Sequence, residues 1–350
     1  MKKILTFLIL CVISVANASN SSVNSTTKHS HKKQHHHKKS HHLHKKIHRT
    51  HRAQALPVKN PAVASPDPII SAAAAQDNAS APVAATGTAV QRPKAKQPRL
   101  YSYSAYAMDG STGEVYISKN PTEQLPIASI TKLMTAMVML DSGANLDDYV
   151  AISDADVDRL RNTYSRLKVG LELKRRDLLL LALMSSENRA AHAIARTAYP
   201  GGLSEFIKRM NRKAKSLGMT NTQFYDPTGL TVQNKSTAID LAKMVSAAYK
   251  YKQIRADTTT KGADVMLTPR YMHHYLNSDA LVRGDRLNIQ VSKTGFINEA
   301  GHCLVLYSLV GNHPIAMVFL NSSGKSGRLI DAMTVTNYVS RYMNSYASAQ

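Results

Sequence analysis

Three short motifs in this chain combine residues that could carry out acyl transfer. In chain order they are Ser129-Ile130-Thr131-Lys132, Ser186-Glu187-Asn188 and Lys293-Thr294-Gly295. A serine followed three residues later by a lysine supplies a nucleophile and a base, because residues three apart lie on one face of a helix. Burial and the positive end of the helix dipole would both lower the pKa of such a lysine. The first motif therefore predicts an activated serine, and the other two would hold its substrate.

The Ser-x-x-Lys spacing is common, and three of its other occurrences cannot support this chemistry. Two copies lie in a polar run and one in a Gly/Ser-rich turn, where no lysine would be buried: Ser25 with Lys28, Ser30 with Lys33, and Ser322 with Lys325. Ser129 instead begins an apolar stretch that continues to Leu140 and follows Pro126, which is typical of the entry to a buried helix. We therefore predict a helix over residues 129–140, with the Lys132 amine within reach of the Ser129 hydroxyl.

The second motif lies where one apolar helical pattern ends and another begins. The first pattern covers residues 177–184 and the second residues 189–196, with Ser186 and Asn188 between them. A polar corner between two buried helices suits the wall of an active site. Helix capping is the alternative role, because these residue types often cap helices.

The third motif follows a strand pattern. Apolar residues alternate at Leu287, Ile289 and Val291, and Lys293 continues the same phase. Gly295 would let a substrate backbone come close to the strand. Each motif alone is common, but their joint occurrence, each on the type of element that its chemistry needs, is specific.

With these motifs in place, the chain from about residue 100 to its end resembles the small serine DD-peptidases of the penicillin-binding proteins, peptidase family S11. Within that family it is most similar to the D-alanyl-D-alanine endopeptidase branch, the penicillin-binding protein 7 type. The stretches that carry the resemblance are 109–114, 126–135, 181–191, 226–230 and 293–305. They are collinear over roughly 250 residues, a normal size for one domain.

The resemblance implies a role for each motif residue. Ser129 would be the nucleophile that forms an acyl ester with a D-alanyl peptide, Lys132 the base that takes its proton, and Ser186 a relay to the leaving amine. The residues implied to bind substrate are Asn188, Lys293, Thr294 and Gly295. Asn188 would hold the substrate's amide, while Lys293 and Thr294 would attract a carboxylate. The oxyanion hole is expected at the backbone N–H groups of Ser129 and Phe296.

The function expected from this resemblance is cleavage of D-alanyl cross-links between peptidoglycan stem peptides, with β-lactam antibiotics as inhibitors. Removal of the terminal D-Ala by a DD-carboxypeptidase is the alternative, and a wall- or metal-binding protein acting through its N-terminal tail is the non-enzymatic alternative. Glu187 is interpreted as a surface or capping residue and not as a deacylating base, so β-lactamase activity is a weaker possibility and bound penicillin should leave slowly. No cofactor and no nucleic-acid partner is expected.

The N-terminus has the pattern of a secretory signal peptide. Basic Met1-Lys2-Lys3 precedes an apolar run over residues 4–15, and small residues end at Ala18, where we expect cleavage and export to the periplasm. An uncleaved anchor is the alternative, but the run is short for a membrane span. Cleavage would remove Cys11 and leave Cys303, predicted to be a buried strand residue, as the one cysteine of the mature chain.

A basic tail is predicted to follow, over residues 19–99. Residues 28–52 contain ten histidines and nine Lys or Arg, and residues 1–100 hold 16 Lys and Arg against 2 Asp and Glu, a net charge of +14 out of +22. Such a segment cannot form a core and should be disordered, with residues 53–99 as an Ala/Pro-rich linker. Its candidate partners are anionic envelope polymers, while divalent metal binding or a plain spacer role are the alternatives.

The remaining residues, 100–350, predict one α+β catalytic domain. A hairpin pattern over residues 103–118 precedes helical patterns over 203–217 and 238–249, and strand patterns over 302–310 and 314–320 precede a final helix over 329–346. These elements predict an antiparallel sheet of about five strands flanked by helices. The same arrangement is implied by the resemblance, as the DD-peptidase/β-lactamase-like fold.

Overall fold

The structure, a computed structural model, describes residues 96–347. The predicted signal peptide, the tail and nearly all of the linker lie outside the described residues. Within residues 96–347, no helix is long and apolar enough to cross a membrane.

A five-stranded antiparallel sheet forms the centre of the domain. Its strand order is β2-β1-β11-β10-β9, so segments from both ends of the domain pair with each other. The strands are β1 (Ser102–Asp109), β2 (Val115–Lys119), β9 (Asn288–Ile297), β10 (Gly301–Val310) and β11 (His313–Ser322). The prediction of an α+β fold with about five strands is confirmed. Because β9 is an edge strand, the third motif lies on the side of the sheet that is open to a ligand.

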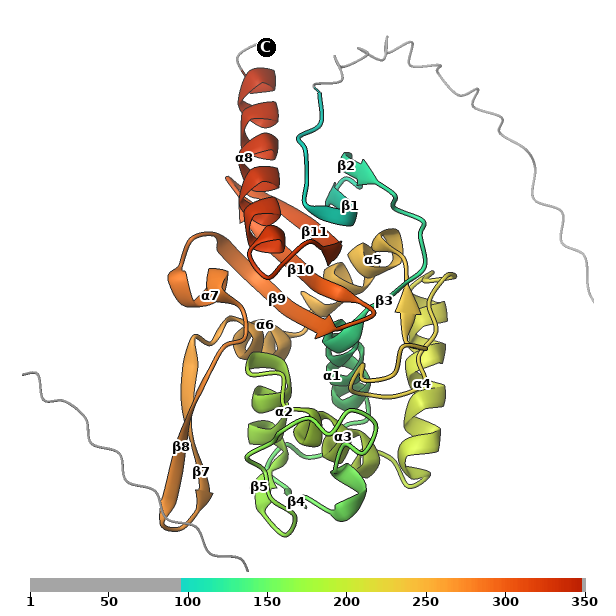
Figure 1. The fold of residues 1–350 in the computed structure, drawn as a ribbon, viewed down its shortest axis with the longest axis vertical. Helices are drawn as coiled ribbons and strands as arrows, with labels where there is room; N and C mark the ends of the chain where they lie inside the picture. The colour runs from blue at the N-terminus through green and yellow to red at the C-terminus, as the bar shows by residue number, and fades with distance from the viewer. Residues whose placement is uncertain (1–95, 348–350) are drawn as a thin grey trace, which may run out of the picture. The chain divides into compact units, whose positions relative to one another are not determined.

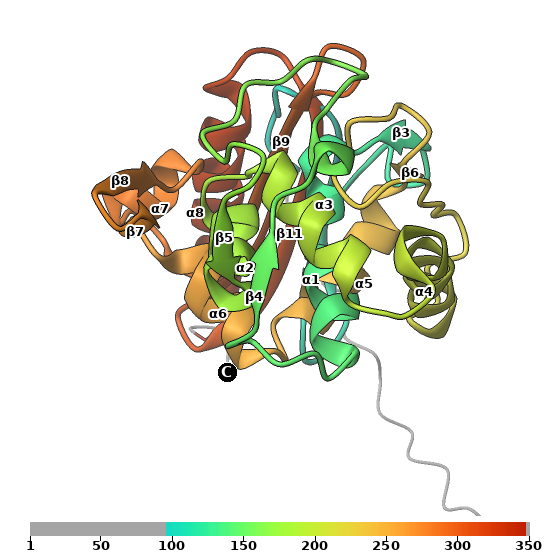
Figure 2. The same cartoon turned by 90° about the horizontal axis from the view of Figure 1, so that it is seen from below.

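Helices cover both faces of this sheet (Figure 1). The C-terminal helix α8 (Gly327–Ala347) packs on one face, and α5 (Ala238–Ala248) packs on the other. The larger helical part lies beyond α5 and surrounds α1 (Thr131–Asp141), in which nine residues are buried (Figure 2). Its other helices are α2 (Arg175–Met184), α3 (Asn188–Thr197), α4 (Gly202–Ser216) and α6 (Lys252–Thr259). The short α7 (Ala280–Gly284) instead packs with the apolar cluster on the α8 side, through Leu281.

Short pairs of strands, none of which was predicted, complete the domain. They are β3 (Leu125–Pro126) with β6 (Lys235–Ser236), β4 (Tyr149–Ala151) with β5 (Glu172–Lys174), and β7 (Gly262–Thr268) with β8 (Tyr271–Leu276). Two of these pairs are only two or three residues long, too short for an alternating pattern to be visible in sequence. The β7–β8 hairpin is longer and projects from the body of the domain (Figure 1).

Two local predictions need correction. The α-helix begins at Thr131 and not at Ser129, which lies in a preceding 3-10 turn, η1 (Ala128–Ile130). The strand phase is also wrong, because a bulge shifts the register of β9 between Ile289 and Val291. Ile289 therefore packs with the apolar cluster on the α8 side, whereas Val291 belongs to the cluster on the helical side. Lys293 shares the phase of Val291 but not that of Ile289. The bulge therefore turns Lys293 and Val291 toward the face of the sheet on which α5 packs.

Candidate active site

Ser129 and Lys132 meet at the junction between the 3-10 turn and α1. Ala128 has a φ of +47°, a rare conformation for a residue with a side chain, and the turn that follows leaves Ser129 half-buried between buried neighbours. Lys132 is 1% exposed, in the first turn of α1. Its Nζ lies 2.9 Å from Ser129 Oγ, so the structure brings the predicted nucleophile and base into hydrogen-bond contact.

The Lys132 amine has three partners, and none of them is charged. Besides Ser129 Oγ, Nζ donates to Asn188 Oδ1 at 2.7 Å and to the carbonyl of Thr228 at 2.8 Å. Burial lowers the pKa of Lys132 to about 7, although nearby carboxylates oppose the shift. A neutral amine has two N–H groups for the two carbonyl oxygens, which leaves its lone pair for the proton of the Ser129 hydroxyl. The geometry therefore suits a base at neutral pH.

A loop that received no functional role from sequence holds the third partner. Asp226 Oδ1 accepts hydrogen bonds from the backbone N–H groups of Thr228 and Gly229, at 2.5 and 2.7 Å, and fixes this loop. Gly229 has a φ of +83°, and a Cβ there would lie 1.9 Å from the carbonyl oxygen of Ala128. Only glycine allows the loop to pack so closely on the 3-10 turn. The Asp-Pro-Thr-Gly stretch is visible in sequence, but its contact with Lys132 is not.

The second lysine of the site contacts the predicted proton relay. Lys293 is also 1% exposed, and its Nζ donates to Ser186 Oγ at 3.0 Å. Burial holds the pKa of Lys293 well below its usual range, and the positive charges of Lys132 and Arg328 lower it further. Ser186 itself has a φ of +65°, which turns the chain sharply between α2 and α3.

Asn188 is oriented by hydrogen bonds on both sides of its amide. While its Oδ1 accepts from Lys132, its Nδ2 donates to Thr163 Oγ1 at 3.0 Å, and that hydroxyl donates to Asp158 Oδ2 at 2.7 Å. Asn188 is the first residue of α3 and its side chain does not cap the helix. The capping alternative therefore fails for Asn188. The Ser186 hydroxyl likewise accepts its hydrogen bond from Lys293.

The interpretation of Glu187 as a surface or capping residue is wrong. Glu187 occupies the N-cap position of α3, but its side chain makes no capping hydrogen bond and is 8% exposed. Its carboxylate instead accepts a hydrogen bond from Ser165 Oγ at 2.8 Å, and its negative charge raises the pKa of Lys132 against the larger effect of burial. The sequence around Glu187 does not indicate that this residue is buried, because the loop that covers it lies more than twenty residues earlier in the chain.

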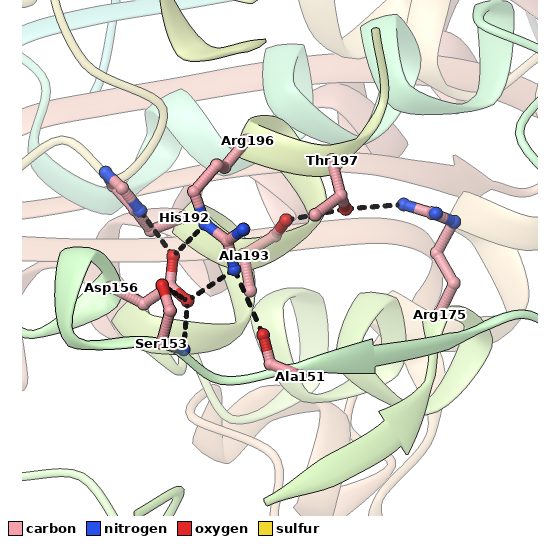
Figure 3. Close-up of polar contacts among 8 residues, drawn as sticks. All are labelled: Ala151, Ser153, Asp156, Arg175, His192, Ala193, Arg196 and Thr197. Carbon is pink, nitrogen blue, oxygen red and sulfur yellow. Dashed lines mark hydrogen bonds and ion pairs between the residues drawn. The ribbon is translucent and has the colours of Figure 1, made fainter. Parts of the chain in front are cut away.

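An ion-pair cluster fixes α3, and with it Asn188, to the 3-10 turn η2 (Asp154–Asp156), which precedes β5 and α2 in the chain (Figure 3). The buried Asp156 carboxylate accepts two hydrogen bonds from Arg196 and lies 2.7 Å from His192 Nδ1. Burial opposes ionisation, but these bonds outweigh it and hold the pKa of Asp156 well below its usual range. Because His192 lies one turn after Asn188, this cluster sets the position of the helix face that carries the site.

The third motif borders the nucleophile through its glycine. A Cβ at Gly295 would lie 3.0 Å from the carbonyl oxygen of Ile127 and 3.2 Å from the backbone nitrogen of Ser129. The glycine therefore allows β9 to pack against the segment that carries the nucleophile, while substrate approach at this residue stays a prediction. Thr294 Oγ1 donates to Ser278 Oγ at 2.8 Å.

Phe296 follows the third motif with a half-exposed ring. This ring stacks on His302 with a centroid separation of 4.5 Å. The residue before Phe296 is held from the protein interior. The buried Arg328 guanidinium donates to the carbonyl of Gly295 at 2.9 Å and to that of Cys303 at 2.8 Å. Arg328 thus fixes the peptide plane that includes the Phe296 N–H. Cys303 is buried in β10, as predicted.

The structure thus brings together two pairs of side chains beside the edge strand β9. Ser129 contacts the buried amine of Lys132, and Ser186 contacts the buried amine of Lys293. Among residues 96–347, no group of three or more His, Cys, Asp or Glu side chains could hold a metal ion. The residues missed by sequence reasoning are Asp158, Thr163, Asp226, Thr228 and Arg328. Sequence spacing gives no sign of them, because the loops that carry them reach the motif residues from far away in the chain: Thr228 contacts Lys132, Thr163 contacts Asn188 and Arg328 contacts Gly295.

Comparison with known proteins identifies the family whose sequences and structures this chain resembles. Residues 91–324 match the sequence profile of Peptidase_S11, described as D-alanyl-D-alanine carboxypeptidase. The chain is 45% identical to the D-alanyl-D-alanine endopeptidase of Escherichia coli over 246 residues, which cover 70% of this chain and 79% of that protein. It is 44% identical to the endopeptidase of Pseudomonas aeruginosa, with coverage of 73% and 84%. The crystal structure of the Streptomyces K15 DD-transpeptidase is similar at a TM-score of 0.66 and 30% identity, over 70% of this chain and 98% of that one.

Proposed function

The chain belongs to the S11 family of serine D-alanyl-D-alanine peptidases, and we propose that within this family it is a periplasmic endopeptidase that opens D-alanyl cross-links in peptidoglycan. One observation carries the assignment of the site: Lys132 Nζ lies 2.9 Å from Ser129 Oγ in a pocket that holds the lysine's pKa near 7. The endopeptidase assignment rests on the identity of about 45% to two proteins of that name.

Acylation begins with Ser129. As its oxygen attacks the carbonyl carbon of the D-alanyl bond, the neutral Lys132 amine takes the hydroxyl proton. The backbone N–H groups of Ser129 and Phe296 stabilise the oxyanion that develops. Support for the second donor comes from Arg328, whose bond to the Gly295 carbonyl fixes the same peptide group and adds a positive charge behind it.

Breakdown of the tetrahedral intermediate breaks the C–N bond and requires a proton on the leaving amine. Ser186 delivers that proton from its hydroxyl, which Lys293 Nζ holds in place at 3.0 Å, and regains one from the Lys132 ammonium group, so that Lys132 is neutral again. Asn188 binds the amide of the substrate backbone, and Thr294 with Gly295 aligns the peptide along β9. Water then attacks the ester while the neutral Lys132 amine takes its proton, and Lys132 passes that proton to Ser129 Oγ as the ester C–O bond breaks.

A DD-carboxypeptidase would use the same residues, so the substrate decides between the two activities. Purified enzyme should be incubated with cross-linked dimeric muropeptides and with monomeric pentapeptides, and the products identified by mass spectrometry. We expect dimers to be converted to monomers faster than pentapeptides lose D-Ala. Trimming of pentapeptides without cleavage of dimers would establish the carboxypeptidase instead.

The N-terminal part of the chain extends the proposal. Cleavage after Ala18 would release a catalytic domain of residues 100–350 into the periplasm, tethered to a basic segment over residues 19–99. This segment would hold the enzyme near anionic envelope polymers by its charge. Divalent metal binding and a spacer role remain its alternatives.

A further inference from the structure

The β7–β8 hairpin presents an aromatic face that the catalytic site does not use. Tyr271, His273 and Tyr275 alternate along β8, so their side chains share one face of the hairpin. Their rings form a continuous row, with centroids 6.1 Å apart for Tyr271 and His273 and 4.7 Å apart for His273 and Tyr275. The Tyr271 hydroxyl lies 3.1 Å from His273 Nδ1, which fixes the two rings relative to each other.

The opposite face of the same hairpin has a different character. There Met266 pairs with Met272 across the two strands, and Asp264 forms an ion pair with His274. Both methionines are exposed, and within the hairpin this face carries no tyrosine. The hairpin therefore offers two surfaces on one scaffold that differ in chemistry.

A further aromatic residue, Tyr164, lies in the loop whose Ser165 contacts Glu187. Burial raises the pKa of Tyr275, and the charge of Glu187 raises it further, while Arg166 acts in the opposite direction and Tyr164 also contributes. Hydrogen bonds place the same loop beside the hairpin: Ser165 donates to Glu187 at 2.8 Å, and Met184, three residues before Glu187, accepts from Ser278, three residues after Tyr275. Tyr164 is 81% exposed, and the Arg166 guanidinium lies 5.6 Å from the centre of its ring. The Tyr275 hydroxyl is buried and has no hydrogen-bond partner among the described residues.

The aromatic row also leads directly to the catalytic site. Beyond the end of β8, the backbone N–H of Ser278 donates to the carbonyl of Met184 at 2.8 Å, and its hydroxyl accepts from Thr294. At about 3.3 Å per residue, His273 and Tyr275 lie roughly 10 to 17 Å from Ser278 along the strand. A peptide of four or five extended residues spans at most about 14 to 18 Å. Measured from Ser278, which contacts Thr294 of the third motif, a stem peptide that runs from β9 along this path would thus bring its sugar end to the distance of the aromatic row.

We propose that Tyr271 and His273, the accessible part of the aromatic row, bind the glycan strand of peptidoglycan together with Tyr164 while the attached stem peptide occupies the catalytic site. Tyr275 is 3% exposed and supports the His273 ring from beneath. The pyranose ring of an amino sugar has a flat C–H face that packs on an aromatic ring, and its hydroxyl and acetamido groups bond to tyrosine and histidine side chains. Arg166 and Arg270, exposed near the two ends of the row, match the carboxylates that stem peptides carry. The inference rests on the proposed function, because it names the part of that substrate which lies outside the catalytic site.

The decisive experiment compares two substrates that differ only in sugar. One is a cross-linked dimeric muropeptide with its disaccharides, and the other is the same cross-linked peptide after an amidase has removed them. Cleavage is followed by chromatography for the wild type, for the double variant Tyr164→Ala/Tyr271→Ala, and for Met272→Ala. The last is the matched control, since Met272 and Tyr271 are neighbours with exposures of 56% and 52% on opposite faces.

We expect the double variant to lose about tenfold in kcat/KM on the sugar-bearing dimer, which corresponds to the loss of one good aromatic contact. Cleavage of the sugar-free peptide and acylation by penicillin should stay unchanged, and Met272→Ala should resemble the wild type on both substrates. Titration of glycan strands that carry no stem peptide, followed by calorimetry, should show weaker binding to the double variant only.

Three outcomes would overturn the inference: no loss on the sugar-bearing dimer, an equal loss on both substrates, or the same loss in Met272→Ala. Failure of the proposed function has a separate signature. In that case the wild type would be acylated by penicillin and yet cleave neither cross-linked substrate, whatever its sugar content.

Discussion

The pKa of Lys132 makes the pH dependence of acylation the sharpest test of the site. Burial lowers this pKa from 10.5 to about 7, against the nearby charges of Asp226, Glu187 and Asp158. At pH 7 about half of the enzyme then carries a free amine at this position, compared with roughly one molecule in 3000 for an ordinary lysine, from a difference of about 3.5 pH units. The rate of acylation should rise with pH, with a midpoint near 7.

The assay measures the second-order rate constant for covalent labelling by a fluorescent penicillin, from about pH 5.5 to about pH 9. Lys132→Arg keeps a positive charge but removes the base, because a guanidinium does not lose its proton in this range. The loss of general-base help should cost roughly 10²- to 10⁴-fold in rate. Glu187→Gln is the matched control: it keeps an acceptor for Ser165 but removes the charge that favours the ammonium form, so its midpoint should move to lower pH.

Three results would refute this reasoning. A rate that does not change between about pH 6 and about pH 8 would mean that the free base of Lys132 is not required. Labelling of Lys132→Arg at more than a tenth of the normal rate would assign the proton transfer to another group. A midpoint that moves upward in Glu187→Gln would show that the carboxylate acts on a different titration.

Further predictions concern the nucleophile, the core and the tail. Ser129→Ala should abolish penicillin labelling and leave the free energy of unfolding nearly unchanged; labelling of this variant would place the nucleophile elsewhere. Burial raises the pKa of Asp257 to about 7, so its protonated form favours the folded state below pH 4, and up to about 4 kcal/mol of stability is lost as the pH rises to 7. Urea unfolding at pH 5 and pH 8 should show a smaller pH dependence for Asp257→Asn, and an equal one would contradict the shift. Removal of residues 19–99 should leave penicillin acylation unchanged but weaken co-sedimentation with sacculi, by a margin that shrinks in high salt and grows below about pH 6.5; equal binding would leave the tail as a spacer.

The sequence was sufficient for features that depend on nearby residues. Ser129 and Lys132 are three apart, and the apolar run that follows them predicts the buried helix that α1 forms. The alternating runs in the last third of the domain likewise predict β10 and β11, since strand periodicity is a local signal. Helices α4 and α5 also lie within a residue or two of the predicted ranges.

Features that depend on distant segments could not be predicted in this way. The Thr228 carbonyl that accepts from Lys132 lies 96 residues away, and Arg328 lies 33 residues after the glycine whose carbonyl it binds. The bulge in β9 is a further case, because it arises where β9 pairs with β10 and not from the pattern of β9 itself. Without the bulge, Lys293 would share the face of Ile289 and point toward α8. Tertiary pairing therefore decides which residue reaches the site, although the sequence identifies the candidates.

The placement of three carboxylates explains how the buried Lys132 keeps a pKa near neutrality. Asp226, Glu187 and Asp158 all raise the pKa of Lys132, yet within residues 96–347 none forms an ion pair with it, because each is hydrogen-bonded to another donor. A direct ion pair would hold Lys132 as the ammonium ion and prevent it from acting as a base. With no charges nearby, burial alone would push its pKa lower and weaken its affinity for the serine proton. Three carboxylates held at a distance keep the pKa near neutrality, where a base both loses and regains its proton readily.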